Sequence, residues 1–241
     1  MHHTVFIAGA TGYIGTRLAE ALAFRGHAVR ALARAGSANR VPAGCAIVHG
    51  SALDSRSYAG EVAPADTFVH LVGTPHPAPW KEREFKAVDL ASLKQSVEAA
   101  RKAAVRHFVY VSVAHPAPVM KAYIRVRSEC EQILAQSGMR TTILRPWYVL
   151  GPGYWWPLAL KPFYWLGEML PSTREGALRL GPVTRAEMVA ALADAIELPD
   201  GTDRVLEVPA IRRSTSCSGA SRGAAPGPPA GASATRATGP A

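Results

Sequence analysis

Residues 4–15 read Thr4-Val-Phe-Ile-Ala-Gly9-Ala-Thr11-Gly12-Tyr13-Ile14-Gly15, and this stretch decides the fold of the chain. A short β-prone run leads into three glycines with the spacing Gly-x-x-Gly-x-x-Gly. Apolar residues then recur at the spacing of one helix face, and Gly26 is placed to end that helix. Glycines at such a turn let the backbone bend tightly and approach a pyrophosphate, whose charge the amides at the helix N-terminus would face. The stretch therefore predicts the first strand, turn and helix of a dinucleotide-binding domain.

The same alternation of strand and helix continues along the chain. Helical periodicity is found at about 90–100 and 122–136. Further β-prone runs occupy residues 28–33, 46–48, 67–72, 108–113, 141–144 and 204–208. Alternation of this kind gives a parallel sheet with helices on both faces. We therefore expect an α/β fold, a doubly wound parallel sheet of the Rossmann type, with the dinucleotide-binding domain over residues 1–150.

The end of the second strand bears on which dinucleotide is bound. An NAD site usually places an acidic residue there to hold the ribose 2′-hydroxyl, but no acid occurs between Glu20 and Asp54. The strand instead ends in Arg34, followed by Ser37 and Arg40. A guanidinium at this point would pair with a 2′-phosphate, so the sequence favours NADP(H) over NAD(H). The alternative is that Arg34 is an ordinary exposed arginine.

The amino-acid composition of the sequence changes after residue 150. Six aromatic residues fall between 154 and 165 with prolines among them, which predicts a small C-terminal substrate lobe over residues 151–211. The lobe should contain one helix, starting at a Thr-x-x-Glu capping box formed by Thr184 and Glu187, and a returning strand. Residues 212–241 are almost entirely Ala, Gly, Pro, Ser, Thr and Arg, and we expect a disordered tail there. A shifted reading frame or a truncated product would explain such an ending.

Composition excludes several functional classes. The formal net charge is +9, but four of these charges are arginines after residue 211, and no basic block interleaved with aromatics precedes them, so we expect no nucleic-acid partner. The three cysteines match neither a disulfide framework nor a zinc pattern, and no metal site is predicted. The N-terminus lacks the features of a signal peptide, and no run of 18 apolar residues predicts an integral membrane segment. A cytoplasmic location is the expectation.

Together with the glycine motif, four later features resemble the extended and atypical short-chain dehydrogenase/reductase superfamily: Val111-Ser112, Tyr123 with a basic residue four positions on, Arg145-Pro146, and Gly151-Pro152-Gly153. Within it, the chain is similar to the atypical branch that includes NmrA-like sensors, epimerase/dehydratase-like proteins and an accessory subunit of respiratory complex I. The resemblance implies an NAD(P)-binding Rossmann fold. It implies cofactor contacts from Gly9, Thr11, Gly12, Tyr13, Ile14, Gly15, Arg34, Asp54, Leu71, Gly73 and Pro146.

The same resemblance implies a catalytic set. In active members a Tyr-x-x-x-Lys pair exchanges a proton with the substrate, and a serine orients the substrate. Here Tyr123 lies four residues before Arg127, and Ser112 stands near the serine position. Arginine keeps the positive charge but cannot give up a proton, and Asp89 stands where an asparagine often supports the proton relay. Alternatively, Tyr123 and Arg127 are surface neighbours, and Glu131 pairs with the arginine at i, i+4.

The substrate is expected at the carboxyl ends of the strands. His76 and Trp80 follow the fourth strand, and Trp147 and Trp155 come from the aromatic segment. A pocket lined by such residues favours a small hydrophobic substrate. The alternatives are that these aromatics form the core of the small lobe, or a contact with a second copy, a peripheral partner or a membrane surface.

Two functions remain open from the sequence. One is NADP(H)-dependent oxidoreductase or epimerase-type chemistry on a small hydrophobic carbonyl or hydroxyl compound, with Tyr123 as the acid or base. The other is a noncatalytic NAD(P)-binding sensor or accessory subunit, which the replacement of lysine by Arg127 favours.

Overall fold

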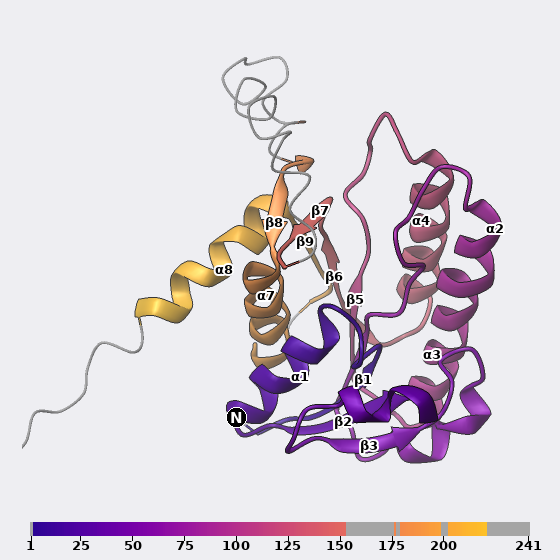
Figure 1. The fold of residues 1–241 in the computed structure, drawn as a ribbon, viewed down its shortest axis with the longest axis vertical. Helices are drawn as coiled ribbons and strands as arrows, with labels where there is room; N and C mark the ends of the chain where they lie inside the picture. Colours follow the sequence, from indigo (N-terminus) through magenta and orange to yellow (C-terminus); the bar gives the residue numbers. More distant parts are fainter. Residues whose placement is uncertain (1, 153–175, 177–178, 199–201, 221–241) are drawn as a thin grey trace, which may run out of the picture.

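The computed structural model describes residues 2–152, 176, 179–198 and 202–220 of the chain (Figure 1). Its centre is a seven-stranded sheet. The strands of this sheet are β1 (Thr4–Ala8), β2 (Ala28–Ala33), β3 (Ala46–His49), β4 (Thr67–His70), β5 (His107–Val111), β6 (Arg140–Arg145) and β9 (Arg204–Glu207). The central strands are almost continuously apolar and buried because both faces of the sheet are covered, as expected for a parallel sheet.

The strand order is β3-β2-β1-β4-β5-β6-β9, and every neighbouring pair is parallel. Val5 of β1 lies between Val29 of β2 and Thr67 of β4, so the chain reverses its direction of progress across the sheet between β1 and β4. This is a doubly wound sheet, and the prediction of a Rossmann-like α/β fold is confirmed. In such sheets the ligand crevice opens at the carboxyl ends of the strands beside the reversal point.

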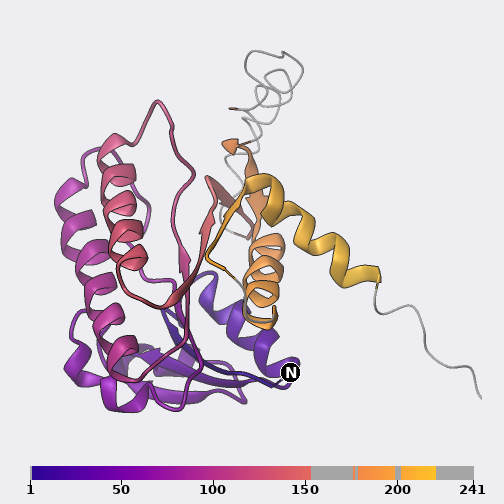
Figure 2. The same cartoon turned by 180° about the vertical axis from the view of Figure 1, so that it is seen from behind.

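Helices cover both faces of the sheet (Figures 1 and 2). One face carries α3 and α4, which pack over a core containing Phe6, Phe68 and Phe108. The other carries α1 and α7, over Ile7 and Val109. The helices are α1 (Gly15–Phe24), α2 (Glu82–Glu84), α3 (Ala91–Lys102), α4 (Lys121–Ala135), α7 (Arg185–Glu197) and α8 (Val208–Ala220), with short turns η1 (Ala35–Arg40), η2 (Ser55–Ser57), η3 (Ala59–Glu61) and η4 (Phe85–Leu90).

The segment expected to form a small lobe is partly joined to the main sheet. Strands β7 (Tyr148–Leu150) and β8 (Pro182–Thr184) form a separate two-stranded parallel sheet. The capping box is present at the start of α7: the Thr184 hydroxyl accepts from the Glu187 amide at 3.1 Å, and the Glu187 carboxylate accepts from the Thr184 amide at 2.6 Å. However, α7 packs on α1 and β9 pairs with β6, so both lie in the main layers. The aromatic residues 154–165 lie outside the described residues.

The disorder expected from Arg212 onward does not begin there. Helix α8 runs from Val208 to Ala220, and Val208 and Ile211 are buried against the face that carries α1 and α7. Arg212 Nη2 donates to the carbonyl oxygen of Pro182 at 2.7 Å and so ties this helix to β8. The composition of this segment did not predict the helix because only its first turn is apolar. Residues 221–241 lie outside the described residues. Among the helices that are described, none is long and apolar enough to cross a bilayer.

Candidate cofactor and substrate site

Two cavities open at the carboxyl ends of the strands, and the larger lies over β1, β2 and β3. We call it the glycine-loop cavity, and its volume is ≈ 440 Å³.

 The lining of the glycine-loop cavity combines the glycine turn after β1 with the segments that follow β2, β3 and β4. The lining residues are Gly9, Thr11, Gly12, Leu32, Arg34, Ser37, Arg40, Gly50, Ser51, Ala52, Leu53, Leu71, Val72, Gly73, Pro75 and Val88.

The glycine turn is shaped by contacts that a side chain would block. Gly9 has a φ of +91°, and a Cβ there would lie 2.9 Å from the carbonyl carbon of Leu71, so only glycine lets the end of β1 approach the end of β4. A Cβ on Gly12 would lie 3.1 Å from the Gly9 oxygen, and one on Gly15 would overlap the same atom. The turn therefore presents bare backbone at the start of α1, a geometry that fits a pyrophosphate.

The far end of the glycine-loop cavity is basic. Arg34 ends β2, and the short turn after it is closed by the Ser37 amide and hydroxyl, which donate to the Arg34 carbonyl at 2.8 and 3.1 Å. This turn places Arg34, Ser37 and Arg40 on one cavity wall. Within the described part of the chain, neither arginine forms an ion pair with a carboxylate. Both guanidinium groups are thus available to an anionic ligand.

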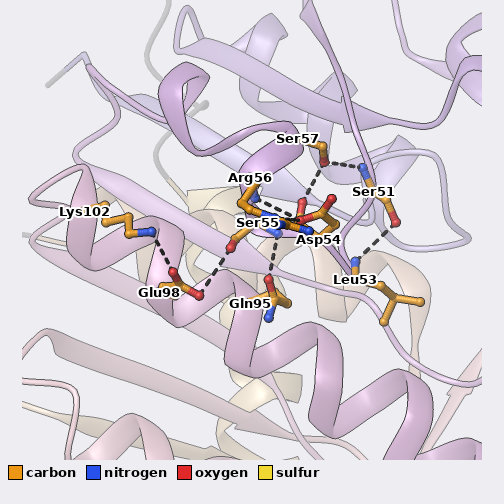
Figure 3. Close-up of polar contacts among 9 residues, drawn as sticks. All are labelled: Ser51, Leu53, Asp54, Ser55, Arg56, Ser57, Gln95, Glu98 and Lys102. Carbon is orange, nitrogen blue, oxygen red and sulfur yellow. Dashed lines mark hydrogen bonds and ion pairs between the residues drawn. The ribbon is translucent and has the colours of Figure 1, made fainter.

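Asp54, expected to contact the cofactor, interacts with Arg56 instead (Figure 3). Its carboxylate accepts from the Arg56 amide at 3.3 Å and from Arg56 Nε at 3.1 Å, and it does not line the cavity. Ser51 and Leu53 line the cavity in its place. The Ser55 amide donates to Gln95 at 2.8 Å, which anchors this loop to α3.

The second cavity, which we call the tyrosine cavity, has a volume of ≈ 250 Å³ and lies over β4, β5 and β6. It shares Leu71 and Gly73 with the glycine-loop cavity, so the two are adjoining parts of one crevice. The predicted residues Tyr123, Arg127 and Ser112 all reach it. Its lining residues are Ile14, Leu71, Gly73, Thr74, Pro77, Val111, Ser112, Val113, Tyr123, Arg127, Pro146, Trp147 and Val149.

Tyr123 and Arg127 lie on one face of α4. The guanidinium carbon of Arg127 is 5.0 Å from the centre of the Tyr123 ring, and the Phe85 ring packs on Tyr123 at 4.8 Å. Burial raises the pKa of the Tyr123 phenol, and the nearby charge of Arg127 opposes this only in part. Tyr123 is therefore a protonated phenol at neutral pH.

Arg127 is held by a set of buried partners. Its Nη2 lies 2.7 Å from Asp89 Oδ1, and its Nη1 donates to the Tyr110 hydroxyl at 3.0 Å and the Val111 carbonyl at 2.9 Å. The other Asp89 oxygen accepts from the Thr74 hydroxyl at 2.6 Å. The sequence gives no sign of the role of Tyr110, which reads as an ordinary residue of a buried strand. Arg127 and Asp89, the two departures from the pattern that the resemblance implies, are thus partners.

Ser112 interacts with Glu131, which the sequence left as a partner for Arg127. The Ser112 hydroxyl donates to Glu131 Oε1 at 2.5 Å. Arg145 donates to the same carboxylate, from Nε at 3.1 Å and from Nη2. Glu131 therefore joins Ser112 to Arg145 of the Arg-Pro motif, and Arg127 pairs with Asp89 instead.

Of the other residues predicted to contact the substrate or cofactor, only some line the two cavities. Trp147 lines the tyrosine cavity, whereas Trp80 is 82% exposed and His76 is also exposed, and neither lines a described wall of the two cavities. Trp155 lies outside the described residues. The Tyr13 ring lies 4.7 Å below the Arg185 guanidinium and is likewise not part of either lining. No group of three potential metal ligands occurs among the described residues.

Comparison with known proteins identifies the family. Residues 9–151, more than half of the chain, match the NAD(P)H-binding family model. A 3-diazoavenalumate denitrifying reductase from Streptomyces sp is 32% identical over 178 residues, covering 62% of this chain and 57% of that protein. A 4-hydroxy-2-methyl-3-oxo-4-farnesyl-3,4-dihydroquinoline-1-oxide ketoreductase from Stigmatella aurantiaca is 27% identical over 168 residues, covering 61% and 50%. The chain thus spans between half and three fifths of these relatives.

Solved structures share the fold at low identity. The Bordetella bronchiseptica enzyme WbmH in complex with NAD+ has a TM-score of 0.65 and 21% identity, covering 94% of this chain and 84% of that one. An Agrobacterium tumefaciens short-chain dehydrogenase/reductase superfamily protein with bound NAD has a TM-score of 0.62 and 17% identity, covering 89% and 82%. With its glycine turn, parallel sheet and family match, the chain belongs to the NAD(P)H-binding family.

Proposed function

We propose that the chain is an NADPH-dependent reductase of small hydrophobic carbonyl compounds. The observation that carries the proposal is the crevice formed by the two adjoining cavities, which share Leu71 and Gly73. One end offers Arg34 and Arg40, which have no carboxylate partner among the described residues, and the other offers the phenol of Tyr123. Such an arrangement suits a dinucleotide phosphate lying along the strand ends with its reactive ring toward Tyr123.

Each end of the crevice has a defined task in this proposal. The amides of the glycine turn hold the pyrophosphate, and Arg34 and Arg40 bind the 2′-phosphate. Bound NADPH supplies the hydride. Tyr123 gives its phenolic proton to the carbonyl oxygen, so that the carbonyl gains one hydride and one proton and becomes an alcohol. Trp147 and the prolines of the rim exclude water and favour an apolar substrate.

The protonated state of Tyr123 supports the direction of reduction. A raised pKa keeps the phenol protonated at neutral pH, as donation to a carbonyl requires, whereas oxidation would require its phenolate. The positive charge of Arg127 is partly neutralised by Asp89, which lies 2.7 Å away. Arg127 therefore stabilises a Tyr123 phenolate less than an unpaired cation would. The names of the two curated relatives, a reductase and a ketoreductase, point the same way.

A noncatalytic NADP-binding sensor is the second candidate. It is favoured by the replacement of the proton-relaying lysine by Arg127, whose two terminal nitrogens contact Asp89, Tyr110 and Val111. A sensor would bind NADPH without consuming it, and its binding would not depend on the Tyr123 hydroxyl.

One set of measurements separates the two. Nicotinamide fluorescence would follow titration with NADPH and NADH, and absorbance would follow NADPH consumption with a panel of small aromatic and aliphatic ketones and aldehydes. We expect NADPH to bind more tightly than NADH, and Tyr123→Phe to lower the turnover number by roughly 100-fold or more with cofactor affinity unchanged. Tyr58→Phe, which removes a phenol from the core, is the matched control. Binding without turnover would establish the sensor instead, and no binding of either dinucleotide would refute both.

A further inference from the structure

The hydrogen bond between Ser112 and Glu131 determines whether Ser112, on the wall of the tyrosine cavity, can donate or only accept a hydrogen bond. Ser112 follows β5 and lines this cavity beside Tyr123. Its hydroxyl oxygen lies 2.5 Å from Glu131 Oε1, whose side chain comes from α4 two turns after Tyr123. Glu131 itself does not line the cavity. The serine therefore stands between a carboxylate and the space in which a substrate would bind.

The proton between these two oxygens belongs to Ser112. Burial opposes ionisation of Glu131, but hydrogen bonds from Arg145 and Ser112 outweigh it and hold the pKa of the carboxyl below its ordinary value. An ionised carboxylate only accepts hydrogen bonds. Ser112 is thus the donor, and its single proton is committed to Glu131.

Glu131 is held in place, which makes this polarity a property of the fold. The Arg145 guanidinium binds both of its oxygens, and Arg145 Nη1 in turn donates to Glu207 of β9 at 3.1 Å. His115 Nε2 adds a further contact to Glu131 Oε1 at 3.6 Å. Rotation of the carboxylate away from Ser112 would break the paired interaction with Arg145. The arrangement therefore links α4 to the ends of β5, β6 and β9.

We propose that Ser112 acts toward the substrate as a hydrogen-bond acceptor, and that the preferred substrates are ketones carrying an O–H or N–H group beside the carbonyl. This rests on the proposed carbonyl reduction. The carbonyl oxygen takes its hydrogen bond from Tyr123, while the adjacent hydroxyl or amino group donates to the free lone pairs of Ser112. Glu131 is a positioning residue, because it acts through Ser112 without lining the cavity.

Binding of a matched pair of compounds tests this assignment: α-hydroxyacetophenone and its methyl ether, α-methoxyacetophenone. Calorimetry would measure their affinities for the protein with and without saturating NADPH, and absorbance would measure NADPH consumption. We expect the hydroxyketone to bind about tenfold more tightly than the ether, since one hydrogen bond is lost on methylation. Ser112→Ala should remove the difference without disturbing Arg145.

Two further variants distinguish a positioning role of Glu131 from a general loss of structure. In Glu131→Gln the side-chain amide can donate to Ser112, which frees the serine proton for the ligand, so the preference should shrink or reverse. Glu129→Gln, on the exposed side of the same helix, should keep the preference of the wild type. Equal affinity of the wild type for both compounds, or no binding of either, would overturn the assignment. A preference in binding without NADPH consumption would sustain the acceptor role of Ser112 while refuting the reductase.

Discussion

Arg127 Nη2 lies 2.7 Å from Asp89 Oδ1, and the two side chains are 7% and 0% exposed. A charge buried to this extent is tolerated only when an opposite charge or a set of hydrogen bonds compensates it. Arg127 and Asp89, which stand where the resemblance to short-chain dehydrogenases implies a lysine and an asparagine, therefore form one unit. Each departure explains the other, because a buried arginine introduces a charge that asparagine would leave unbalanced.

Breaking this pair from one side should be costly. Asp89→Asn leaves the Arg127 guanidinium buried without its counter-charge, and we expect the free energy of unfolding to fall by about 3–5 kcal/mol. Arg127→Met should also destabilise the protein, but the double variant should lose less than the sum of the two by more than about 1 kcal/mol. Urea unfolding of the four proteins measures this coupling. Strict additivity would show that the pair is energetically irrelevant.

Gly73 should be intolerant of even one methyl group. A Cβ at this position would overlap Arg127 Nη2 and lie 3.2 Å from Asp89 Oδ1, so Gly73→Ala must push the guanidinium away from its carboxylate. We expect a loss of about 1–3 kcal/mol in the free energy of unfolding. Gly60→Ala, where a Cβ would meet no atom within 4 Å, is the matched control. An equal effect at both positions would contradict the steric argument.

The basic end of the glycine-loop cavity should set the choice of cofactor. Arg34→Ala removes a charge-assisted interaction with a 2′-phosphate and should weaken NADPH binding by roughly 10- to 100-fold, with little change for NADH. Fluorescence titration with both dinucleotides provides the measurement. Arg56→Ala removes an exposed arginine that does not line the cavity and should leave both affinities unchanged. Parallel losses for NADPH and NADH would argue against a 2′-phosphate site.

His70 should make folding sensitive to mild acid. It is buried between Ser92 and Ser96, and burial lowers its pKa from 6.5 to about 3. Between these values the unfolded chain binds a proton that the folded protein does not, so stability falls as the pH drops below 6.5, by about 1.4 kcal/mol per pH unit from this residue. The gap in unfolding free energy between wild type and His70→Gln should therefore shrink from pH 7 to pH 5. A constant gap would be inconsistent with a buried neutral histidine.

The sequence predicted the main layers well because their signals are local. The glycine spacing, the apolar strands and the Thr184 capping box each depend on residues close together in the chain, and each is present in the fold. Helix α8 was missed for the same reason: its burial depends on Ile211 meeting a distant face of the sheet, which composition does not reveal.

The site was harder to predict because its pairings cross long distances in sequence. The residues next to them in sequence do not show that Arg127 pairs with Asp89 or that Glu131 pairs with Arg145. Side-chain direction in loops is equally hidden, so Trp80 was expected in the pocket and is exposed. Spacing on a helix identifies which side chains share a face, and tertiary structure decides which partner each one takes.

The wall formed by Leu71 and Gly73 makes the occupants of the two cavities thermodynamically linked. Any ligand that shifts this shared backbone in one cavity alters the shape of the other. By reciprocity, a carbonyl compound that tightens the hold on the dinucleotide must itself be held more tightly, by the same factor, once the dinucleotide is in place. Two adjoining cavities with one common wall thus give each occupant a means to change the affinity of the other cavity for its ligand.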